Sequence, residues 1–495
     1  MVNKKYILAI DQGTSSTKSL IFDEKGIAVA KGSEPLRTSY FDNGFVEQDP
    51  QEIYSNVLAS VKYCLQDFIA KGYTPGDIAC VGLSNQRETF ILWDEDGEPL
   101  YPAVVWQCKR SVEICRQLKE QGLSEKINQK TGLVIDPYFS GTKLIWLMQN
   151  NPEIAKSVKN GNAYFGTVDT WLLYKLSKGN YATDYTNASR TLFFNIQTLT
   201  WDEDLIADFG LNGLQLPQIK PSSSFFGETN LGGLLDQSVP VTAMIGDSHA
   251  AAFGAGCFDR GSAKATLGTG SSIMMNIGDK PLQSQNGMVT TINWSIEGRV
   301  DYALEGVIVT CGATIEWLKN ELGLFNNSVE TEAMALAVEE NTGVYLIPAF
   351  SGLGSPHWQM DRRASISGLS FGTTKNHIVR AALESIPYQI KDVIAAMEND
   401  TGVNLKQLVT NGGLTSNNFV MQFLADILDR PVNRGANPDV SAMGAAYMAG
   451  LYVGIYKDIE QLRTLSENDK VYQPSHNKSK VENWYAGWQK LIKKN

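Results

Sequence analysis

The sequence predicts an α/β protein with two domains of similar size. The chain has 495 residues, which is more than one ordinary hydrophobic core accommodates. Short apolar runs alternate with amphipathic segments from the first residues onward, which predicts β-strands and helices on a mixed sheet. The same alternation starts again after residue 240. We therefore expect two domains, residues 1–253 and 254–495, with a ligand cleft between them.

Four segments define the first predicted domain. Residues 6–11 form an apolar run that ends at Asp11, which is typical of a buried strand. Residues 14–23 read as a glycine-led turn that enters a second strand. Apolar residues recur at helical spacing over 51–70, and the apolar run at 78–86 predicts another strand.

The second domain repeats this order of elements. Strands are predicted within residues 241–247, 262–272, 299–306 and 405–413. A helix should follow, with Asn417 and Asn418 as capping residues. Its apolar face comprises Phe419, Val420, Phe423, Leu424, Ile427 and Leu428.

Composition excludes several functional classes. The net charge is -10 and there is no long Lys/Arg run, so binding to nucleic acid is not expected. No stretch reaches the roughly 18 apolar residues of a membrane span. The six cysteines form no C-x-x-C pair, which indicates reduced thiols in a cytoplasmic protein, and four histidines make a His-rich metal site improbable.

Three glycine-containing turns follow predicted strands. "DQGTSSTK" (11–18) aligns hydroxyls and backbone N–H groups after a tight turn at Gly13, and Lys18 adds positive charge. Such a loop can bind phosphate oxygens, although it lacks the second glycine of a P-loop and could be a plain hairpin turn. "ATLGTGSS" (265–272) and "TNGG" (410–413) are similar. Small residues at a strand end also let a flat base approach the backbone.

Charged and aromatic side chains follow other strands. Asp247 lies where a strand meets a helix, so it could be a helix cap or a catalytic base. Arg87 and Glu88 could present a donor fork and an acceptor to hydroxyl groups, or form a surface ion pair. Trp106 could provide a flat wall or belong to the core, and Tyr138 precedes a helix.

Longer stretches reveal a family resemblance over essentially the whole chain. The stretches are "DQGTSS", "NQRET", "VVWQC", "YFSGTKLIWLMQN", "GTVDTWL", "TDYTNASRTLFFN", "ASISGLSFGTTKNHIVRAALE" and "MGAAYMAGL". In these the chain resembles the FGGY carbohydrate kinases, and among them the members that phosphorylate glycerol. The resemblance implies two actin-like (ribonuclease H-like) domains, ATP and Mg²⁺ in the cleft, and transfer of the γ-phosphoryl group to a terminal hydroxyl.

The resemblance also implies roles for individual residues. Asp247 would be the catalytic base, and Asp11 and Asp247 would lie near the metal. Residues implied to hold the nucleotide are Thr14, Ser15, Ser16, Lys18, Thr269, Gly312, Glu316, Gly413 and Asn417. Residues implied to hold the polyol are Arg87, Glu88, Trp106, Tyr138, Asp247 and Ser248. A homo-oligomer, dimer or tetramer, is implied as well.

The pocket departs from the family pattern on one side. Ser248 and Ser272 stand where glycerol-specific members usually carry Gln and Phe, and His249 replaces a second Gln. This leaves open an alternative acceptor, a polyol or ketose of four to five carbons. Glu228 stands where some bacterial members carry a phosphorylated His, and the bisphosphate-binding Arg of others is absent. A chaperone, a cytoskeletal protein or an inactive kinase homologue are the rival readings, and the Arg87–Glu88 row and intact Asp11 and Asp247 argue against them.

Overall fold

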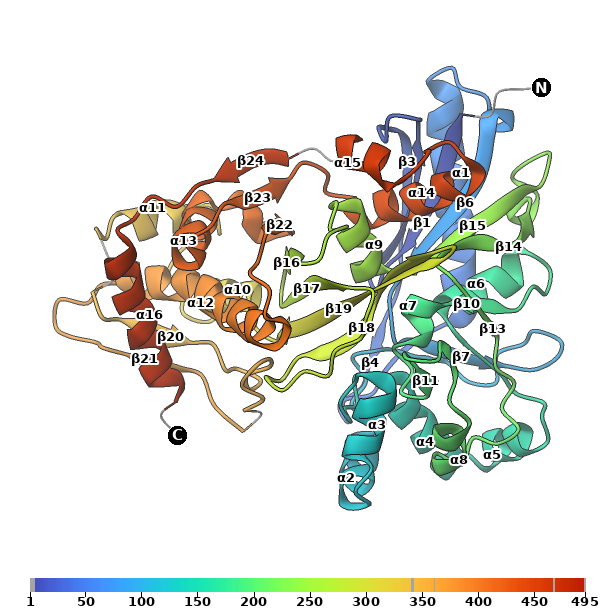
Figure 1. Ribbon diagram of the computed structural model, residues 1–495, viewed down its shortest axis with the longest axis horizontal. Coiled ribbons are helices and arrows are strands. Elements are labelled where there is room, and N and C mark those ends of the chain that lie inside the picture. The colour runs from blue at the N-terminus through green and yellow to red at the C-terminus, as the bar shows by residue number, and fades with distance from the viewer. Residues whose placement is uncertain (1–4, 340–341, 360, 466–467, 494–495) are drawn as a thin grey trace.

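The computed structural model describes residues 5–339, 342–359, 361–465 and 468–493. Figure 1 shows two α/β halves side by side, with the N-terminal half on the right and the C-terminal half on the left. A central mixed sheet lies in each half, and helices pack against its faces. This arrangement confirms the predicted α/β fold with two domains.

The sheet of the N-terminal half has six strands in the order β14-β15-β6-β1-β2-β3. The central strands β1, β6 and β15 are parallel to one another, while β2, β3 and β14 are antiparallel to their neighbours. The bounds are β1 Tyr6–Gln12, β2 Ser16–Phe22, β3 Ala28–Pro35, β6 Ile78–Asn85, β14 Ser223–Thr229 and β15 Val239–Gly246.

The sheet of the C-terminal half has seven strands in the order β18-β19-β17-β16-β22-β23-β24. The bounds are β16 Ser262–Leu267, β17 Ser271–Gly278, β18 Val289–Ile296, β19 Arg299–Ile308, β22 Gln407–Asn411, β23 Val432–Gly435 and β24 Asn468–Tyr472.

The two sheets have the same pattern of strand directions. From β3 to β14 the successive pairs are antiparallel, antiparallel, parallel, parallel and antiparallel. From β19 to β24 the sequence of pairs is identical, with β18 added at the edge. The first hairpin turn of each sheet, β1–β2 and β16–β17, therefore occupies an equivalent position. This duplication is the feature expected of two actin-like domains.

A five-stranded sheet forms a separate layer of the N-terminal half, in the order β4-β5-β8-β7-β9. Its bounds are β4 Ser39–Tyr40, β5 Val46–Gln48, β7 Phe90–Trp93, β8 Ala103–Val104 and β9 Tyr164–Thr167. Three two-stranded ribbons complete the strands: β10 Ala182–Asp184 with β13 Gln218–Lys220, β11 Phe194–Asn195 with β12 Thr200–Trp201, and β20 Tyr345–Ile347 with β21 Ser365–Ser367.

Helices of the N-terminal half pack against its six-stranded sheet and against its five-stranded sheet. Asp49 caps α1 by accepting a hydrogen bond from the Gln51 N–H, and Pro50 occupies its first turn, where a missing N–H costs nothing. The bounds are α1 Pro50–Ala70, α2 Val112–Glu120, α3 Ser124–Thr131, α4 Ser140–Asn150, α5 Pro152–Lys159, α6 Val168–Leu176, α7 Tyr185–Ala188, α8 Glu203–Asp208 and α9 Asp247–Gly254.

In the C-terminal half the 27-residue helix α12 is buried along most of its length and packs against α13. Asn417 caps α13 by accepting a hydrogen bond from the Val420 N–H at 3.1 Å, as the sequence predicts. The helices that follow α9 along the chain, whichever half they pack on, are α10 Gly312–Asn320, α11 Glu330–Leu336, α12 Lys375–Thr401, α13 Asn418–Leu428, α14 Val440–Val453, α15 Ile459–Leu465 and α16 Lys478–Ile492.

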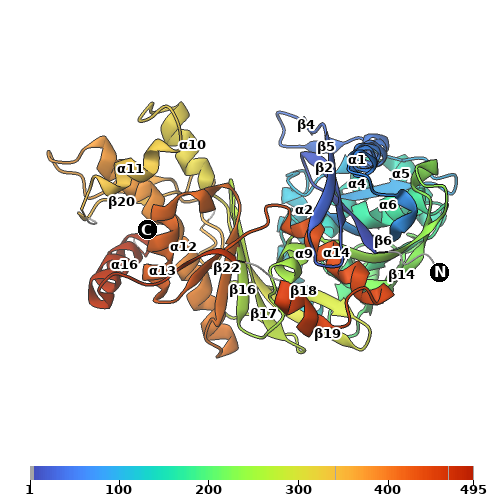
Figure 2. The same cartoon turned by 90° about the horizontal axis from the view of Figure 1, so that it is seen from above.

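Helix α14 crosses from the C-terminal part of the chain to the N-terminal sheet. It packs on β1, β6 and β15, and it lies against α9 near the boundary between the two halves (Figure 2). The helices approach closely because Gly444 of α14 has no side chain at the contact with Ala250 of α9. The predicted boundary between residues 253 and 254 falls at the end of α9 and remains a prediction.

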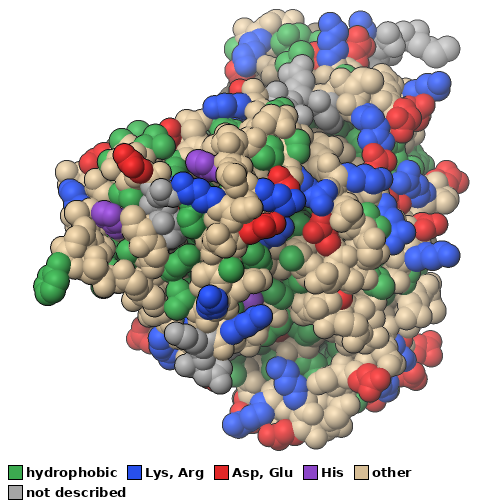
Figure 3. Space-filling view, turned by 60° about the vertical axis from the view of Figure 1, so that its left-hand side comes forward, with side chains coloured by type: hydrophobic (Ala, Val, Ile, Leu, Met, Phe, Trp, Pro, Cys, Tyr) green, Lys and Arg blue, Asp and Glu red, His purple; other side chains and the backbone are tan. Residues whose placement is uncertain are grey.

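The surface is mixed in character. On the face in Figure 3, acidic and basic side chains lie interspersed. Among the residues that the structure describes, none of the helices has the length and apolar character needed to cross a membrane.

We predict that Gly444→Ala destabilises the protein. The new methyl carbon would lie 1.9 Å from the Ala250 carbonyl oxygen, and backbone cannot yield as a flexible side chain does. Overpacking of this kind costs about 1–3 kcal/mol or more in unfolding free energy. Gly76→Ala is the matched control, because its nearest neighbour would lie at 3.8 Å, and we expect a change within about 0.5 kcal/mol. Equal midpoints of chemical denaturation for both variants would contradict the close helix contact.

Candidate functional site

A cavity of about 650 Å³ lies between the two halves. The N-terminal half contributes the ends of strands and the β1–β2 turn, and the C-terminal half contributes the β16–β17 turn and β19. Lining residues include Thr14, Arg87, Glu88, Trp106, Tyr138, Arg190, Asp247, Ser248, Thr266, Thr269, Ser272, Glu305 and Ser355. The predicted polyol residues and one predicted nucleotide residue from each half thus share one cavity.

Parallel pairing places the N-terminal residues at one edge. Gln12, at the end of β1, is level with Asn85 of β6, and Asn85 is level with Gly246 of β15. Since the carboxyl ends of parallel strands meet at the same edge, the residues that follow these strands converge. Arg87 and Glu88 follow β6, and Asp247 follows β15.

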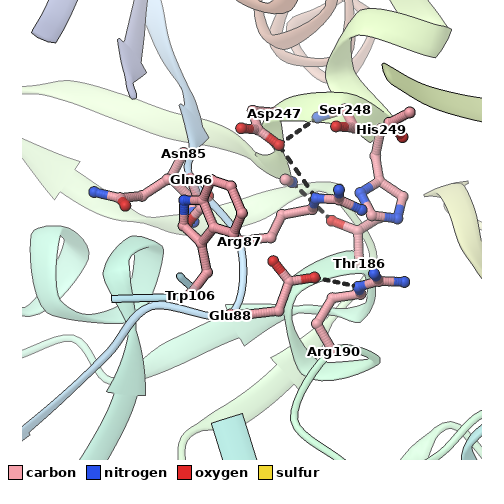
Figure 4. Close-up of polar contacts among 12 residues, drawn as sticks. Asn85, Gln86, Arg87, Glu88, Trp106, Thr186, Arg190, Asp247, Ser248 and His249 are labelled. Carbon is pink, nitrogen blue, oxygen red and sulfur yellow. Dashed lines mark hydrogen bonds and ion pairs between the residues drawn. The ribbon is translucent and has the colours of Figure 1, made fainter. Parts of the chain in front are cut away.

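Arg87 is the centre of a buried set of ion pairs, part of which Figure 4 shows. Its Nε lies 3.2 Å from Asp247 Oδ1, and its Nη2 lies 2.9 Å from Glu305 Oε1 of β19. Arg190 pairs with the other Glu305 oxygen at 2.7 Å and with Glu88 Oε1 at 2.6 Å. We call Arg87, Glu88, Arg190, Asp247 and Glu305 the charge cluster.

Burial makes the pairing within the charge cluster important. The side chains of Arg190 and Glu305 are fully buried, and buried charges require partners. Burial alone would raise the pKa of Glu305, but the Arg190 and Arg87 guanidinium groups outweigh it and hold the pKa well below its usual range. Glu88 is strained as well as buried, because its φ of 60° lies in the left-handed region.

Asp247 is the most exposed member of the cluster, with 37% of its side chain accessible. Gly246 occupies the N-cap position of α9, so the capping interpretation of Asp247 is wrong. Its Oδ1 accepts a hydrogen bond from the Ser248 N–H at 2.6 Å and pairs with Arg87. A carboxylate held in this way at the cavity wall can accept a proton from a bound hydroxyl.

Aromatic side chains form the wall beside the charge cluster. The rings of Trp106 and Tyr138 meet edge to face with centroids 5.6 Å apart. Trp106 Nε1 donates a hydrogen bond to Thr14 Oγ1 at 2.9 Å, which links this wall to the β1–β2 turn. Arg87 Nη2 lies 3.5 Å from the Tyr138 hydroxyl. Such a wall suits a small molecule with both carbon–hydrogen surface and hydroxyl groups.

Asp11 lies behind Asp247 at the end of β1. Burial and the repulsion of Asp247 raise the pKa of Asp11 to about 6, although the Ser84 hydroxyl donates a hydrogen bond to it at 3.0 Å. Two carboxylates that repel each other favour a cation between them. The described residues hold no group of three or more His, Cys, Asp or Glu side chains suited to a metal. Mg²⁺, however, typically uses one or two carboxylates together with substrate phosphates.

The remaining predicted nucleotide residues lie outside this cavity. Lys18 pairs with Asp439 at 2.8 Å, and Asp439 also pairs with Lys31. Ser15 belongs to the same β1–β2 turn as Thr14, and Ser16 is the first residue of β2. Glu316 is exposed on α10, where it pairs with Lys319.

Gly312, Gly413 and Asn417 come from two neighbouring helix starts. Gly312 begins α10. A methyl group added to Gly312 would lie 2.7 Å from the Gly268 carbonyl oxygen and 3.3 Å from the Leu414 side chain. Gly413 begins the short helix η3 (Gly413–Ser416), directly before Asn417. A flat group could approach the backbone here, because a side chain at Gly413 would have no neighbour within 4 Å.

Sequence reasoning missed three charged residues of the site: Arg190, Glu305 and Lys264. Lys264 is buried on β16, and its ammonium group donates a hydrogen bond to the Thr266 hydroxyl at the cavity wall. Burial lowers its pKa to about 8, while Asp247 opposes this by favouring the charged form. Each of the three is a single charge in an otherwise apolar or small-residue run, and that signal could have found them.

His249 does not line the cavity. It is fully buried, its Nε2 lies 3.4 Å from Thr291 Oγ1, and burial together with Arg87 and Arg190 lowers its pKa well below the usual value. It therefore packs behind Arg87 as a neutral side chain.

Two duplicated α/β domains that face a shared cavity lined by charged and aromatic side chains define a two-domain enzyme of the actin-like class. Comparison with known proteins identifies the family. The family models for the N-terminal and C-terminal domains of the FGGY carbohydrate kinases match residues 6–254 and 263–452. The chain belongs to the FGGY family of carbohydrate kinases.

Individual relatives are similar over their full length. The chain is 45% identical to a glycerol kinase of Carboxydothermus hydrogenoformans over 99% of its length and 98% of that protein. A glycerol kinase of Bacillus anthracis is equally similar, with the same coverage. The crystal structure of Plasmodium falciparum glycerol kinase with ADP superposes with a TM-score of 0.94 at 38% identity, covering 98% of this chain and 97% of that one.

We predict that Asp11→Asn stabilises the unliganded protein at alkaline pH. A pKa of about 6 in the folded state exceeds the ordinary 3.8, so the parent loses stability as pH rises through about 6. The shift corresponds to about 3 kcal/mol at most, and the variant does not have this loss. Thermal unfolding midpoints at pH 8 should favour the variant, and the difference should nearly vanish at pH 4. An equal difference at both pH values would contradict the electrostatic explanation.

Proposed function

We propose that this protein transfers the γ-phosphoryl group of ATP to a terminal hydroxyl of glycerol, giving glycerol 3-phosphate. The observation that carries the proposal is the shared cavity, where Asp247, Arg87 and Glu88 face the β1–β2 and β16–β17 turns. The full-length similarity to glycerol kinases supports glycerol as the acceptor.

In this proposal the polyol lies against the Trp106 and Tyr138 rings. Arg87 donates hydrogen bonds to its hydroxyls and Glu88 accepts them. Asp247 removes the proton from the attacking hydroxyl as the oxygen approaches phosphorus. Arg87 orients Asp247, since its Nε is 3.2 Å from the carboxylate.

The nucleotide would lie between the equivalent turns of the two domains. Backbone N–H groups and hydroxyls of Thr14, Ser15, Ser16 and Thr269 would bind the phosphates, and Lys18 could join them by exchanging Asp439 for phosphate oxygens. The adenine ring of the nucleotide would approach the open backbone at Gly413, near Gly312, Glu316 and Asn417. Holding both substrates in line is the main contribution of such a site to phosphoryl transfer.

Asp11 and Asp247 are the proposed ligands of Mg²⁺. Burial and the charge of Asp247 raise the pKa of Asp11, and this supports a cation shared between the two carboxylates. Bound Mg²⁺ would neutralise charge on the β- and γ-phosphates.

We also propose a cytoplasmic location and a homo-oligomeric state. All six cysteines are buried free thiols, which is typical of a reducing compartment, and the family resemblance implies a dimer or tetramer.

The alternative acceptor of four to five carbons is not favoured by the relatives, which are named glycerol kinases. The structure gives a physical reason to doubt a simply enlarged pocket. The Ser272 hydroxyl donates a hydrogen bond to Glu305 Oε1 at 2.9 Å, so this serine serves the charge cluster instead of only vacating space.

We predict that the protein releases little ADP from ATP and Mg²⁺ alone and that glycerol stimulates this release strongly. A closed cleft must exclude water to prevent wasteful hydrolysis, so turnover should depend on the acceptor. A coupled ADP assay with glycerol and with four- and five-carbon polyols and ketoses measures this. Absence of stimulation by every acceptor would refute the kinase proposal, and preference for a longer acceptor would refute glycerol.

We predict that Asp247→Asn lowers kcat by about 10²–10⁴-fold, because positioned proton transfer typically contributes that much. Asparagine keeps an oxygen that can accept from the Ser248 N–H, so folding and ATP binding should persist. Calorimetric ATP binding and steady-state kinetics on the same preparation separate the two effects. An unchanged kcat would show that Asp247 is not the base.

A further inference from the structure

The charge cluster contains two residues, Glu305 and Arg190, to which the proposed reaction gives no task. Neither was predicted from the sequence, yet both are fully buried and both contact a proposed polyol residue. We propose that Glu305 is a positioning residue for polyol recognition, which, held by Arg190 and Ser272, fixes the orientation of Arg87 and Glu88. This inference rests on the proposed polyol kinase function.

Glu305 occupies a fixed place in an inner strand. It lies in β19, which pairs with β17 on one side and β18 on the other, and it is level with Met274 and Val289. A residue in an inner strand has little backbone freedom, since its strand is hydrogen-bonded to an adjacent strand on each side. The carboxylate of Glu305 is therefore a fixed reference point that the C-terminal half presents to the N-terminal half.

The carboxylate of Glu305 is itself held by neighbouring side chains. Arg190 lies 2.7 Å from Oε2, and the Ser272 hydroxyl donates to Oε1 at 2.9 Å. Arg87 shares that same Oε1 at 2.9 Å. Oε1 thus accepts two hydrogen bonds, while Oε2 is held by the Arg190 ion pair without a hydrogen bond, and the doubly bonded Oε1 positions Arg87 Nη2.

Arg190 connects the two charged residues proposed to bind the polyol, Arg87 and Glu88. It pairs directly with Glu88 and reaches Arg87 through Glu305, as the contacts above show. Figure 4 shows Glu88 turned toward Arg190. Because Glu88 also has a left-handed backbone conformation, this ion pair helps to keep its carboxylate at the cavity wall.

The charge of Glu305 also determines how Arg87 is placed. Glu305 lies between two guanidinium groups that would otherwise repel each other, and it binds Nη2 of Arg87 while Asp247 binds Nε. Without the Glu305 charge, Arg87 would turn toward Asp247, its other carboxylate partner. Arg87 would then leave the orientation in which it meets polyol hydroxyls.

The test is steady-state kinetics with glycerol and ATP on the parent, Glu305→Gln, Ser272→Ala, the double variant and one control variant. We expect Glu305→Gln to raise the KM for glycerol by about 10–100-fold, as loss of a hydrogen bond to a charged group does. The KM for ATP should change by less than about 3-fold. Ser272→Ala should raise the glycerol KM by about 3–10-fold.

The double variant separates positioning from direct contact. If Ser272 acts through Glu305, its removal should add nothing in the Glu305→Gln background, because coupled residues are not additive. Glu384→Gln is the matched control, since Glu384 is a buried partner of Arg380 in the same half at 2.7 Å and does not line the cavity. It should leave the glycerol KM unchanged.

Distinct outcomes decide the inference and the proposed function. A parent that shows no glycerol-dependent ADP release overturns the proposed function. An active parent whose glycerol KM is the same in Glu305→Gln, or additive effects of the two substitutions, overturns the positioning inference alone. If Glu305→Gln does not fold, Ser272→Ala decides by itself: a raised glycerol KM with unchanged ATP KM supports the inference, and an unchanged glycerol KM overturns it.

Discussion

The guanidinium group of Arg87 connects the two halves of this protein at the point where they share a cavity. It lies between Asp247, which follows a strand of the N-terminal sheet, and Glu305, which belongs to a strand of the C-terminal sheet. An unpaired charge at this depth would be very unfavourable, so each partner depends on the others. The position of the proposed base, the polyol residues and the interdomain contact are therefore set by one group of ion pairs.

The sequence predicts the parts of the site that depend on local pattern. The strands that precede Asp11 and Arg87 are apolar runs ended by polar or turn residues, and the structure has them at Tyr6–Gln12 and Ile78–Asn85. Asp247 follows Val239–Gly246 for the same reason. The family resemblance then supplied roles that these patterns leave open.

Other parts of the site depend on contacts that no local pattern contains. Arg190 meets Glu88 across 102 residues of chain, and Arg87 meets Glu305 across 218. In the sequence, Ser272 is interpreted as the loss of an aromatic side chain from the pocket. In the structure, its hydroxyl donates a hydrogen bond to Glu305. The sequence indicates that the order of elements repeats after residue 240, but the matching strand order and directions of the two sheets depend on long-range pairing.

The return of α14 to the N-terminal sheet has a consequence for synthesis of the chain. This helix ends at Val453, and it packs on β1, β6 and β15, whose strands are complete by residue 246. While the ribosome makes the intervening residues, the face that α14 will occupy stays exposed to solvent. The N-terminal half therefore cannot reach its final form during translation until the chain has been made and released as far as Val453.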